Sequence, residues 1–281
     1  MVELPSSRSG QTAEQVARTC AAEAGRLIMD RFRGGLRREQ MVAKGRGNFV
    51  TETDVACEQL VLDILSHEYG DMRVLSEETA PPGLVDRTDP GPIPEGWLWV
   101  VDPLDGTHNF SQGIPQFAFN IALCHNREPV LGLTYAPATG DEFFAQAGAG
   151  LFVNGSPGRV SDVGSLSQSV WGMDLGYNDI RAGRLIELVA EIWPGVQAVR
   201  VIGSAALGLA YAASGRYDLF VHHFVYPWDI APGIVMVREA GGTIVDRDGG
   251  PITLYSEGVV AGSPAPVREL LEHARGKPWR E

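Results

Sequence analysis

Hydrophobic and polar positions alternate along this chain with two periods, one typical of helices and one typical of strands. Apolar residues recur every three or four positions in five segments, which predicts helices over residues 12–33, 54–69, 181–193, 205–214 and 230–240. Short β-prone or apolar runs predict strands over residues 48–51, 73–76, 97–101, 117–124, 129–135, 142–147, 169–173, 198–201, 218–221 and 243–245. Strands and helices follow one another in blocks, which favours an α/β protein whose sheets are covered by helices.

The run that begins at Trp97 is unusual because it ends in two carboxylates, Asp102 and Asp105. Charge at the end of a buried strand is costly unless something compensates it. Two carboxylates three residues apart, with Pro103 stiffening the turn between them, can converge on a hard divalent cation such as Mg²⁺. Gly106 and Thr107 follow at a predicted helix start, where backbone N–H groups suit a phosphate oxygen. This segment therefore predicts a metal ion that holds a phosphate.

Further acidic residues lie where a strand-like run ends or a helical one begins. Asp54 opens a predicted helix, Glu77 and Glu78 end a predicted strand, and Asp229 follows Trp228 at another helix start. Any one of them has an ordinary alternative, as a helix cap or a solvated loop carboxylate. In open α/β architectures, however, functional groups gather where strands end and helices begin. Together these acids predict one site, provided that the fold brings them together.

The charge of the chain narrows the choice of partners. Its formal net charge is −12 over 281 residues, and its lysines are Lys44 and Lys277. An acidic surface repels nucleic acid and anionic lipid, so we expect neither a nucleic-acid partner nor a membrane partner. It also repels a phosphorylated substrate unless local cations reverse the field, which favours a metal-assisted site. The acidity is equally compatible with a role in solubility alone.

Hydropathy and cysteine content indicate the cellular compartment in which the protein is expected. No apolar run approaches the roughly 20 residues that span a bilayer, and the first 18 residues lack the apolar segment of a secretory signal. The three cysteines, Cys20, Cys57 and Cys124, lie far apart in apolar surroundings, and no pair has ligand spacing. They are expected to be buried free thiols in a reducing compartment. We therefore expect a cytoplasmic protein.

A set of motifs in a fixed order resembles the inositol monophosphatase family of Mg²⁺-dependent, lithium-sensitive phosphatases. The resemblance covers about residues 12–275. Its central element is an Asp-Pro-x-Asp-Gly-Thr-x-Asn-Phe sequence, combined with a Trp-Asp pair at a later helix start. The segments that carry it are Lys44, Val50–Asp54, Ser76–Glu78, Trp99–Phe110, Gly203–Ala206, Trp228–Asp229 and Glu239–Gly242.

The resemblance implies an α/β fold of layered type, the five-layer αβαβα sandwich of inositol monophosphatases and fructose-1,6-bisphosphatases. It implies a single domain over residues 12–275, with short tails at 1–11 and 276–281. An N-terminal metal-binding lobe would cover about residues 12–150 and a C-terminal lobe about residues 151–275. It also implies a homodimer.

The resemblance further implies a site for two or three Mg²⁺ ions. Glu77, Asp102 and the backbone carbonyl of Leu104 would hold one ion. Asp102, Asp105 and Asp229 would hold a second, so that Asp102 bridges the two. A third, weaker ion would bind Glu77 and waters, with Glu78 behind it.

The remaining roles concern water and substrate. Asp54 and Thr107 would orient and deprotonate the attacking water, with Glu77 completing the catalytic group. Metals would lower the pKa of the water and neutralise charge on the leaving alkoxide. Lys44 would lie behind the metal ligands, as Glu78 does. The substrate would contact Asp105, Gly106, Thr107, Gly203, Ser204, Ala205, His222 and Asp229.

Three positions depart from the family pattern. His222 stands where inositol-preferring relatives carry an acid, and its neighbour His223 points to the opposite face if both lie in a strand. We interpret His222 as a substrate contact, with a structural role and a metal ligand as alternatives. Asn48 replaces a frequent Asp, which alters the weakest metal position, and His108 replaces a small hydroxyl residue. His108 faces either the pocket as a neutral ring or the surface.

The sequence therefore predicts a metal-dependent phosphoric monoester hydrolase acting on inositol monophosphate or a related sugar or polyol phosphate. Alternatives within the family are fructose-1,6-bisphosphate, histidinol phosphate and 3′-phosphoadenosine phosphates. A regulatory or binding protein that retains the fold is an alternative of another class. A phosphatase of the haloacid dehalogenase type is disfavoured, because Asp102 and Asp105 are three positions apart rather than two and Lys277 lies too near the C-terminus.

Overall fold

The structure is a computed structural model that describes residues 3–34, 41–45, 48–85 and 93–280. Its largest sheet has seven strands in the order β3-β4-β5-β6-β7-β8-β9. Only the β3–β4 pair is parallel among these strands, so the rest form the antiparallel meander expected from the turn-rich sequence. The strands are β3 (Arg73–Ser76), β4 (Trp97–Asp105), β5 (Ala118–His125), β6 (Glu128–Ala136), β7 (Asp141–Gln146), β8 (Gly150–Val153) and β9 (Ser156–Gly158).

A second sheet of five strands has the order β11-β10-β12-β14-β13. Strands β11, β10 and β12 are parallel, whereas β14 is antiparallel to both of its neighbours. A separate two-stranded ribbon pairs β1 (Met41–Gly45) with β2 (Asn48–Thr51). The five strands are β10 (Val170–Asp174), β11 (Ala198–Val201), β12 (Leu219–His222), β13 (Thr243–Asp246) and β14 (Val259–Gly262).

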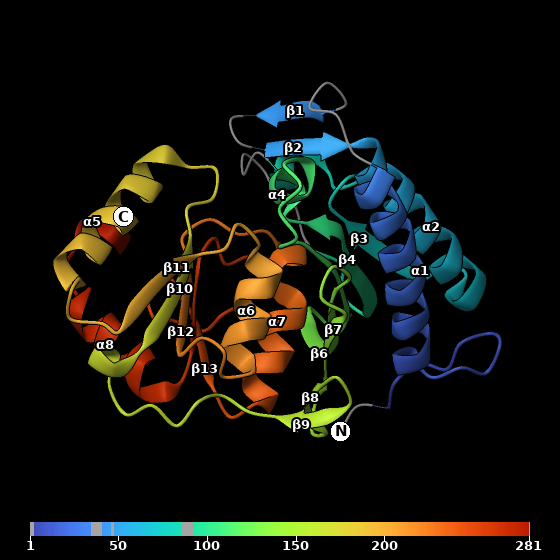
Figure 1. Cartoon of the computed structure of the whole chain (residues 1–281). Coiled ribbons are helices and arrows are strands. Elements are labelled where there is room, and N and C mark those ends of the chain that lie inside the picture. The colour runs from blue at the N-terminus through green and yellow to red at the C-terminus, as the bar shows by residue number, and fades with distance from the viewer. Residues whose placement is uncertain (1–2, 35–40, 46–47, 86–92, 281) are drawn as a thin grey trace.

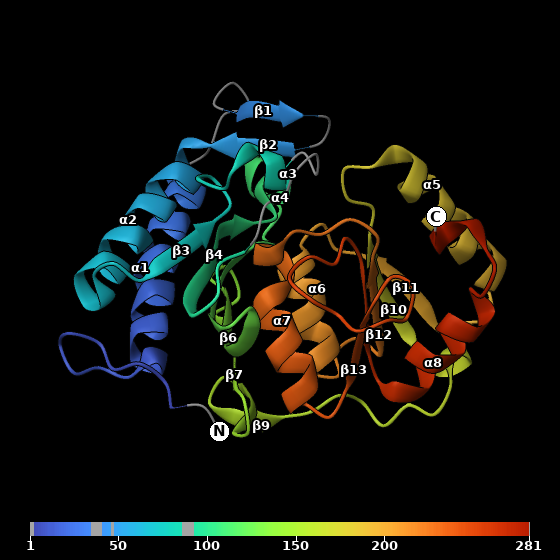
Figure 2. The ribbon, with the colours of Figure 1, turned by 180° about the vertical axis from the view of Figure 1, so that it is seen from behind.

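Helices cover both sheets and separate them, so the chain forms five layers (Figures 1 and 2). Helices α1 (Ala13–Gly34) and α2 (Glu52–Tyr69) lie on the outer face of the seven-stranded sheet. Helices α6 (Ala205–Ala213) and α7 (Pro227–Glu239) lie between the sheets. Helices α5 (Asp179–Ile192) and α8 (Pro264–His273) cover the other side. This is the expected αβαβα sandwich. Shorter helical segments are α3 (Pro82–Val85), α4 (Thr107–Ser111) and two 3₁₀ turns, Leu166–Gln168 and Pro278–Arg280.

The central layer explains why α6 and α7 are apolar on every side. A helix between two sheets has no solvent-facing stripe, and nearly all residues of α6 are buried. Close packing also requires small residues there. A Cβ atom added at Gly208 would lie 2.1 Å from the Phe220 ring, and one at Gly233 would lie 2.6 Å from Leu209. The glycines thus let the central helices approach the sheet and each other.

The helices and strands predicted from the sequence all form, with ends shifted by up to four residues, the largest shift being at the end of β4. The segments that were not predicted are β1, β8, β9, β14, α3 and α8. Cys20, Cys57 and Cys124 are free and buried, as predicted. Among the helices that the structure describes, none has the length and apolar character needed to cross a membrane. The single domain over residues 12–275 and its division near residue 150 stay predictions.

Candidate active site

The ends of strands from both sheets meet the first turns of helices at one cavity of about 270 Å³. The seven-stranded sheet contributes the end of β4, and the five-stranded sheet contributes the ends of β10 and β12. The starts of α4, α6 and α7 complete the lining. The predicted site residues that line this cavity are Asp105, Gly106, Thr107, Gly203, Ser204, Ala205, His222 and Asp229.

A break in the β4–β5 ladder makes the carboxylates of β4 converge. Residues three apart in a regular strand point to opposite faces of the sheet. Here the pairing register shifts between Asp102 and Asp105, so Pro103 and Leu104 bulge out of the ladder. Proline lacks the N–H that a central strand requires, which favours a bulge at this position. The bulge turns both carboxylates toward the same point.

Asp102, Asp105 and Asp229 form an acidic cluster in which one carboxylate oxygen from each lies within 4.8 Å of the others. Asp102 is 1% exposed and Asp105 is 8% exposed. Burial, followed by the negative charges of Glu77, Asp105 and Asp229, raises the pKa of Asp102 well above its usual range. Burial likewise raises the pKa of Asp105 to about 6. Such a cluster of hard oxygen ligands with mutually repelling charges fits a divalent cation, which would compensate it.

Glu77 and Leu104 lie at the edge of this cluster. The Glu77 amide donates to the Val101 carbonyl at 3.3 Å, which holds the residue beside the end of β4. Glu77 also contributes the largest charge effect on Asp102. The Leu104 amide donates to Asp102 Oδ1 at 3.1 Å, and the Leu104 carbonyl oxygen accepts from the Thr107 hydroxyl at 2.9 Å. Both predicted metal-binding positions are therefore next to Asp102.

Asp54 reaches the cavity through Thr107. It is the third residue of α2 and closes a capping box, in which the Thr51 amide donates to Asp54 Oδ2 at 2.8 Å. The other oxygen, Oδ1, accepts from the Thr107 hydroxyl at 2.8 Å. Burial raises the pKa of Asp54, which strengthens the carboxylate as a proton acceptor. The capping motif thus supports a polar pair beside the acidic cluster.

Asp229 is held in the same way at the start of α7. Its carboxylate accepts from the Tyr226 amide at 2.7 Å, so the two helix-opening acids of the site are both fixed by capping boxes. The first turn of α7 is tied to the large sheet by Asn120, whose side-chain amide donates to the Trp228 carbonyl at 2.7 Å. Asn109 similarly ties α4 to the loop before α6, since its amide donates to the Ile202 carbonyl at 2.8 Å.

Asp174 is a buried acid at the cavity that the sequence analysis did not single out. It accepts from the Gly203 amide at 2.6 Å and from the Ser204 amide at 3.3 Å. Ser204 in turn donates its hydroxyl to Asp105. Burial, and secondarily the charge of Asp105, raises the pKa of Asp174 to about 7. The residue ends β10 as Asp105 ends β4, so the strand-end rule would have identified it.

His222 and His223 behave as their alternation in a strand predicts. His222 lines the cavity, whereas His223 is fully buried and does not. Burial, followed by the neighbouring His223, lowers the pKa of His222 to about 3, so the ring is neutral. Its Nδ1 accepts from the Phe224 amide at 3.1 Å, which leaves the proton on Nε2. His108 also lines the cavity. Of the two orientations that the sequence left open, toward the pocket or toward the surface, this agrees with the first.

Glu78 lies beside a second buried acid that the sequence analysis did not single out. Glu58, in α2, accepts from the backbone amides of Glu78 and Thr79 at 3.1 and 3.2 Å. It therefore fixes the turn that carries Glu77. The side chains of Lys44 and Asn48 lie outside the described part of the structure.

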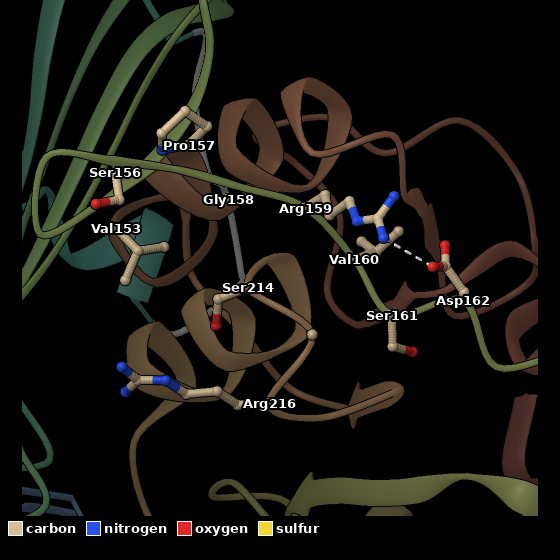
Figure 3. Close-up of a pocket in the computed structure, with 11 residues that line it drawn as sticks. Val153, Ser156, Pro157, Gly158, Arg159, Val160, Ser161, Asp162, Ser214 and Arg216 are labelled. Carbon is tan, nitrogen blue, oxygen red and sulfur yellow. Dashed lines mark hydrogen bonds and ion pairs between the residues drawn. The ribbon is translucent and has the colours of Figure 1, made fainter.

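A different depression lies between β9 and the end of α6 (Figure 3). Two arginines line it, but both are paired with acids. Arg159 contacts Asp162 at 2.9 Å, and Arg216 contacts Asp141 at 2.6 Å. It contains none of the predicted site residues, so the acidic cavity is the better candidate active site.

Comparison with known proteins agrees with this choice of site. The model of the inositol monophosphatase family matches residues 10–277. An inositol monophosphatase of Dictyostelium discoideum is 36% identical over 261 residues, which cover 91% of this chain and 92% of that protein. A fructose-1,6-bisphosphatase/inositol-1-monophosphatase of Thermotoga maritima is 35% identical over 240 residues, with 83% and 88% covered. The crystal structure of the extragenic suppressor protein suhB from Bartonella henselae superimposes with a TM-score of 0.83 and 32% identity, covering 94% of this chain and 98% of that one.

The layered fold and the acidic cavity, together with these matches, define a phosphoric monoester hydrolase of the inositol monophosphatase and fructose-1,6-bisphosphatase type. The chain belongs to the inositol monophosphatase family.

Proposed function

We propose that this protein is a Mg²⁺-dependent phosphomonoesterase that hydrolyses inositol monophosphate or a related sugar or polyol phosphate by direct attack of water. The observation that carries the proposal is the position of the Thr107–Asp54 pair beside the acidic cluster. The Thr107 hydroxyl contacts the Leu104 carbonyl oxygen, and the Leu104 amide donates to Asp102 of the cluster. A hydroxyl that can receive a proton thus lies next to ligands for a divalent cation.

Asp102, Asp105 and Asp229 would hold one Mg²⁺, and Glu77 with Asp102 and the Leu104 carbonyl a second. A third, weaker ion would rest on Glu77. When bound, the ions acidify water and neutralise negative charge on the phosphate and the leaving alkoxide. The convergence of three carboxylates and the raised pKa of Asp102 support this assignment.

The protein's own residues would move the proton. Thr107 has one hydroxyl hydrogen, which lies within reach of both Asp54 Oδ1 and the Leu104 carbonyl oxygen. Donated to Asp54, it leaves an oxygen lone pair that can accept a hydrogen from water. As the oxygen of water bonds to phosphorus, its proton passes to Thr107 Oγ1, and the Thr107 proton passes to Asp54 Oδ1. The ester P–O bond breaks, and the alcohol leaves after taking up a proton from solvent. Because burial raises the pKa of Asp54, the buried carboxylate is a better proton acceptor than an exposed one.

Backbone groups and the cavity wall would position the substrate. The amides of Gly106 and Thr107, at the first turn of α4, would donate to phosphate oxygens. Gly106 has φ +85°, and an added Cβ would lie 2.9 Å from the Gln116 carbonyl oxygen, so glycine is required at this close approach. Gly203, Ser204, Ala205 and His222, which line the same cavity, would contact the leaving group.

The test is release of inorganic phosphate by the purified protein. We expect hydrolysis of inositol 1-phosphate at fixed Mg²⁺ and its loss on addition of EDTA. The panel should include fructose-1,6-bisphosphate, because a Thermotoga maritima relative carries that activity in its name, together with histidinol phosphate and 3′-phosphoadenosine 5′-phosphate. Activity that survives EDTA, or none on any monoester, would contradict the proposal and favour a binding or regulatory protein with this fold.

Three further properties belong to the same proposal and rest on the family relationship. They are a homodimeric state, inhibition by lithium and a cytoplasmic location. The three buried free thiols are consistent with the last of these. Light scattering at micromolar concentration tests the first, and Mg²⁺-dependent phosphate release in the presence of LiCl tests the second. Cell fractionation tests the third.

A further inference from the structure

The cavity that Asp105 and Asp229 line also has an apolar rim. We define this rim as Leu175, Gly176, Tyr177, Val201 and Phe224, all of which line the cavity. Tyr177 is 47% exposed and Val201 is 61% exposed, although both are large apolar residues. Such side chains gathered at the mouth of a polar cavity mark a contact surface for a ligand. The rim therefore favours a ligand with an apolar face.

Tyr177 is held in place by the turn that carries it. Gly176 has φ +52°, and an added Cβ would lie 2.9 Å from His222 Cε1 and 3.0 Å from Phe224 Cβ. The turn therefore lies directly on the end of β12. The Tyr177 ring meets the Phe224 ring edge to face, with centroids 6.4 Å apart and an interplanar angle of 77°. These contacts make the ring a preformed wall of the cavity.

Tyr177 lines the same cavity as Asp105 and Asp229 of the acidic cluster. Burial of the phenol oxygen raises the pKa of Tyr177 well above its usual range, and the charges of Glu77, Asp229, Asp105 and Asp102 add to the effect. Tyr177 is 47% exposed and still lines the cavity beside these acids. The side chain thus brings one hydrogen-bond donor and a flat apolar surface to the cavity.

We propose that Tyr177 is a specificity-determining residue that selects a cyclic polyol as the leaving group. Its ring would pack on the C–H face of the polyol, and its hydroxyl would donate to one of the polyol oxygens. This inference rests on the proposed function, since it concerns the alcohol part of the same monoester. The cavity volume of about 270 Å³ lies just below the typical range of about 300–1,000 Å³ for small-molecule sites, which suits one six-membered ring with its phosphate.

The test compares two substrates on three variants. Inositol 1-phosphate carries the ring that would reach Tyr177, whereas glycerol 2-phosphate carries the same ester bond on a three-carbon chain. Tyr177→Ala removes the ring and the hydroxyl, and Tyr177→Phe removes the hydroxyl alone. Ile180→Ala is the matched control, because Ile180 is 70% exposed, lies three residues along the chain and does not line the cavity.

We expect Tyr177→Ala to lower kcat/KM for inositol 1-phosphate about 30- to 50-fold, mainly through KM, because it removes an aromatic contact of about tenfold and a hydrogen bond of about three- to fivefold. For glycerol 2-phosphate we expect a change of less than about twofold. Tyr177→Phe should lose about three- to fivefold on the ring substrate, as for one neutral hydrogen bond. Ile180→Ala should match the wild type on both substrates.

An equal loss on both substrates, or no loss on either, overturns the role of Tyr177 while leaving the proposed function intact. With 2′-AMP added to the assay as a nucleotide probe, a tenfold larger loss on 2′-AMP than on inositol 1-phosphate also overturns it, since the wall would then serve a nucleobase. Failure of the wild type to release phosphate from either substrate overturns the proposed function itself, and the inference with it. The unfolding temperature of each variant separates these outcomes from a general loss of structure.

Discussion

The acidic cluster and the apolar rim meet at one cavity but are built in opposite ways. The cluster, Asp102, Asp105 and Asp229, is largely buried and comes from a strand end and a helix start. The rim is partly exposed and comes from the turn after β10, the end of β11 and Phe224 after β12. A buried, repelling cluster is costly for folding, whereas exposed rim residues cost little. This difference assigns reaction chemistry to the cluster and substrate choice to the rim.

The two regions also differ in how firmly they are positioned. Hydrogen bonds from other elements hold the backbone around the cluster, since Asn120 anchors the start of α7 and Glu58 anchors the turn at Glu77. Tyr177 is held by the packing of Gly176 and by one aromatic contact. Changes in the cluster should therefore remove activity on every substrate. Changes in the rim should alter the ranking of substrates.

Replacing Asp102 by Asn is expected to have the largest effect. It removes the carboxylate that would bridge two metal ions, so phosphate release should fall at least about 10³-fold on all substrates. The same change removes a repelling charge from a buried cluster, so the metal-free protein should not lose stability. Asp162→Asn is the control, because Asp162 is exposed and pairs with Arg159 outside the cavity. Retained activity, or a large fall in the unfolding temperature without Mg²⁺, would contradict this assignment.

Thr107→Val is expected to have the next largest effect. Valine keeps the shape of the side chain but cannot donate to Asp54 or accept from water. We expect kcat to fall about 10²-fold, as for loss of a positioned proton acceptor, with little change in the Mg²⁺ concentration that gives half-maximal activity. Thr139→Val, on a surface turn, is the control. A variant that instead needs much more Mg²⁺ at unchanged kcat would assign Thr107 to metal binding.

Much of the cluster was predictable from the sequence. An apolar run that ends in Asp102 and Asp105 predicts a strand-end site, and alternation of side chains at the end of β12 correctly separates His222 from His223, the residue that follows the strand. The bulge that lets the two aspartates converge was not predictable as a register shift, because it depends on pairing with β5. Asp174 follows the strand predicted over residues 169–173 as Asp102 follows the run over residues 97–101, so it was predictable by the same rule and was overlooked.

The rim was less predictable, because contacts distant in sequence define it. Tyr177 forms a wall only because Gly176 adopts a positive φ and packs on Phe224, almost fifty residues later. Helix α8 was missed for a local reason. Its first turn contains Pro264 and Pro266, which usually signal a loop but are tolerated at a helix N-terminus. Periodicity thus located the buried layers, whereas tertiary contacts determined the shape of the cavity mouth.

Asp174→Asn tests whether Asp174, the acid at the end of β10 in the five-stranded sheet, has a raised pKa as the buried acids of the cluster do. Its pKa of about 7 exceeds the unfolded value near 3.8, so the folded state holds the proton to higher pH. Stability therefore declines as pH rises from about 4 to 7, by up to about 1.4 kcal/mol per unit of pKa shift. Asn cannot ionise and loses one acceptor for the Gly203 and Ser204 amides.

The metal-free variant should accordingly be less stable than the wild type at pH 5, and the difference should shrink or reverse at pH 8. Urea unfolding at both pH values, with EDTA present, measures it. Parallel pH profiles for the two proteins would show that Asp174 does not titrate in this range. Asp179→Asn, at the start of α5 outside the cavity lining, should leave the profile unchanged.

His222→Glu is expected to have the smallest effect and to appear only in substrate ranking. The native ring is neutral, with a pKa near 3, and its Nδ1 is already used by the Phe224 amide. A carboxylate there would accept from a substrate hydroxyl and repel a second phosphate. The ratio of kcat/KM for inositol 1-phosphate to that for fructose-1,6-bisphosphate should therefore rise about three- to tenfold, as expected for one charge-assisted hydrogen bond. His222→Gln, which stays neutral, should keep the native ratio. Equal ratios in all three proteins would place substrate choice entirely on the rim and leave His222 with a structural role.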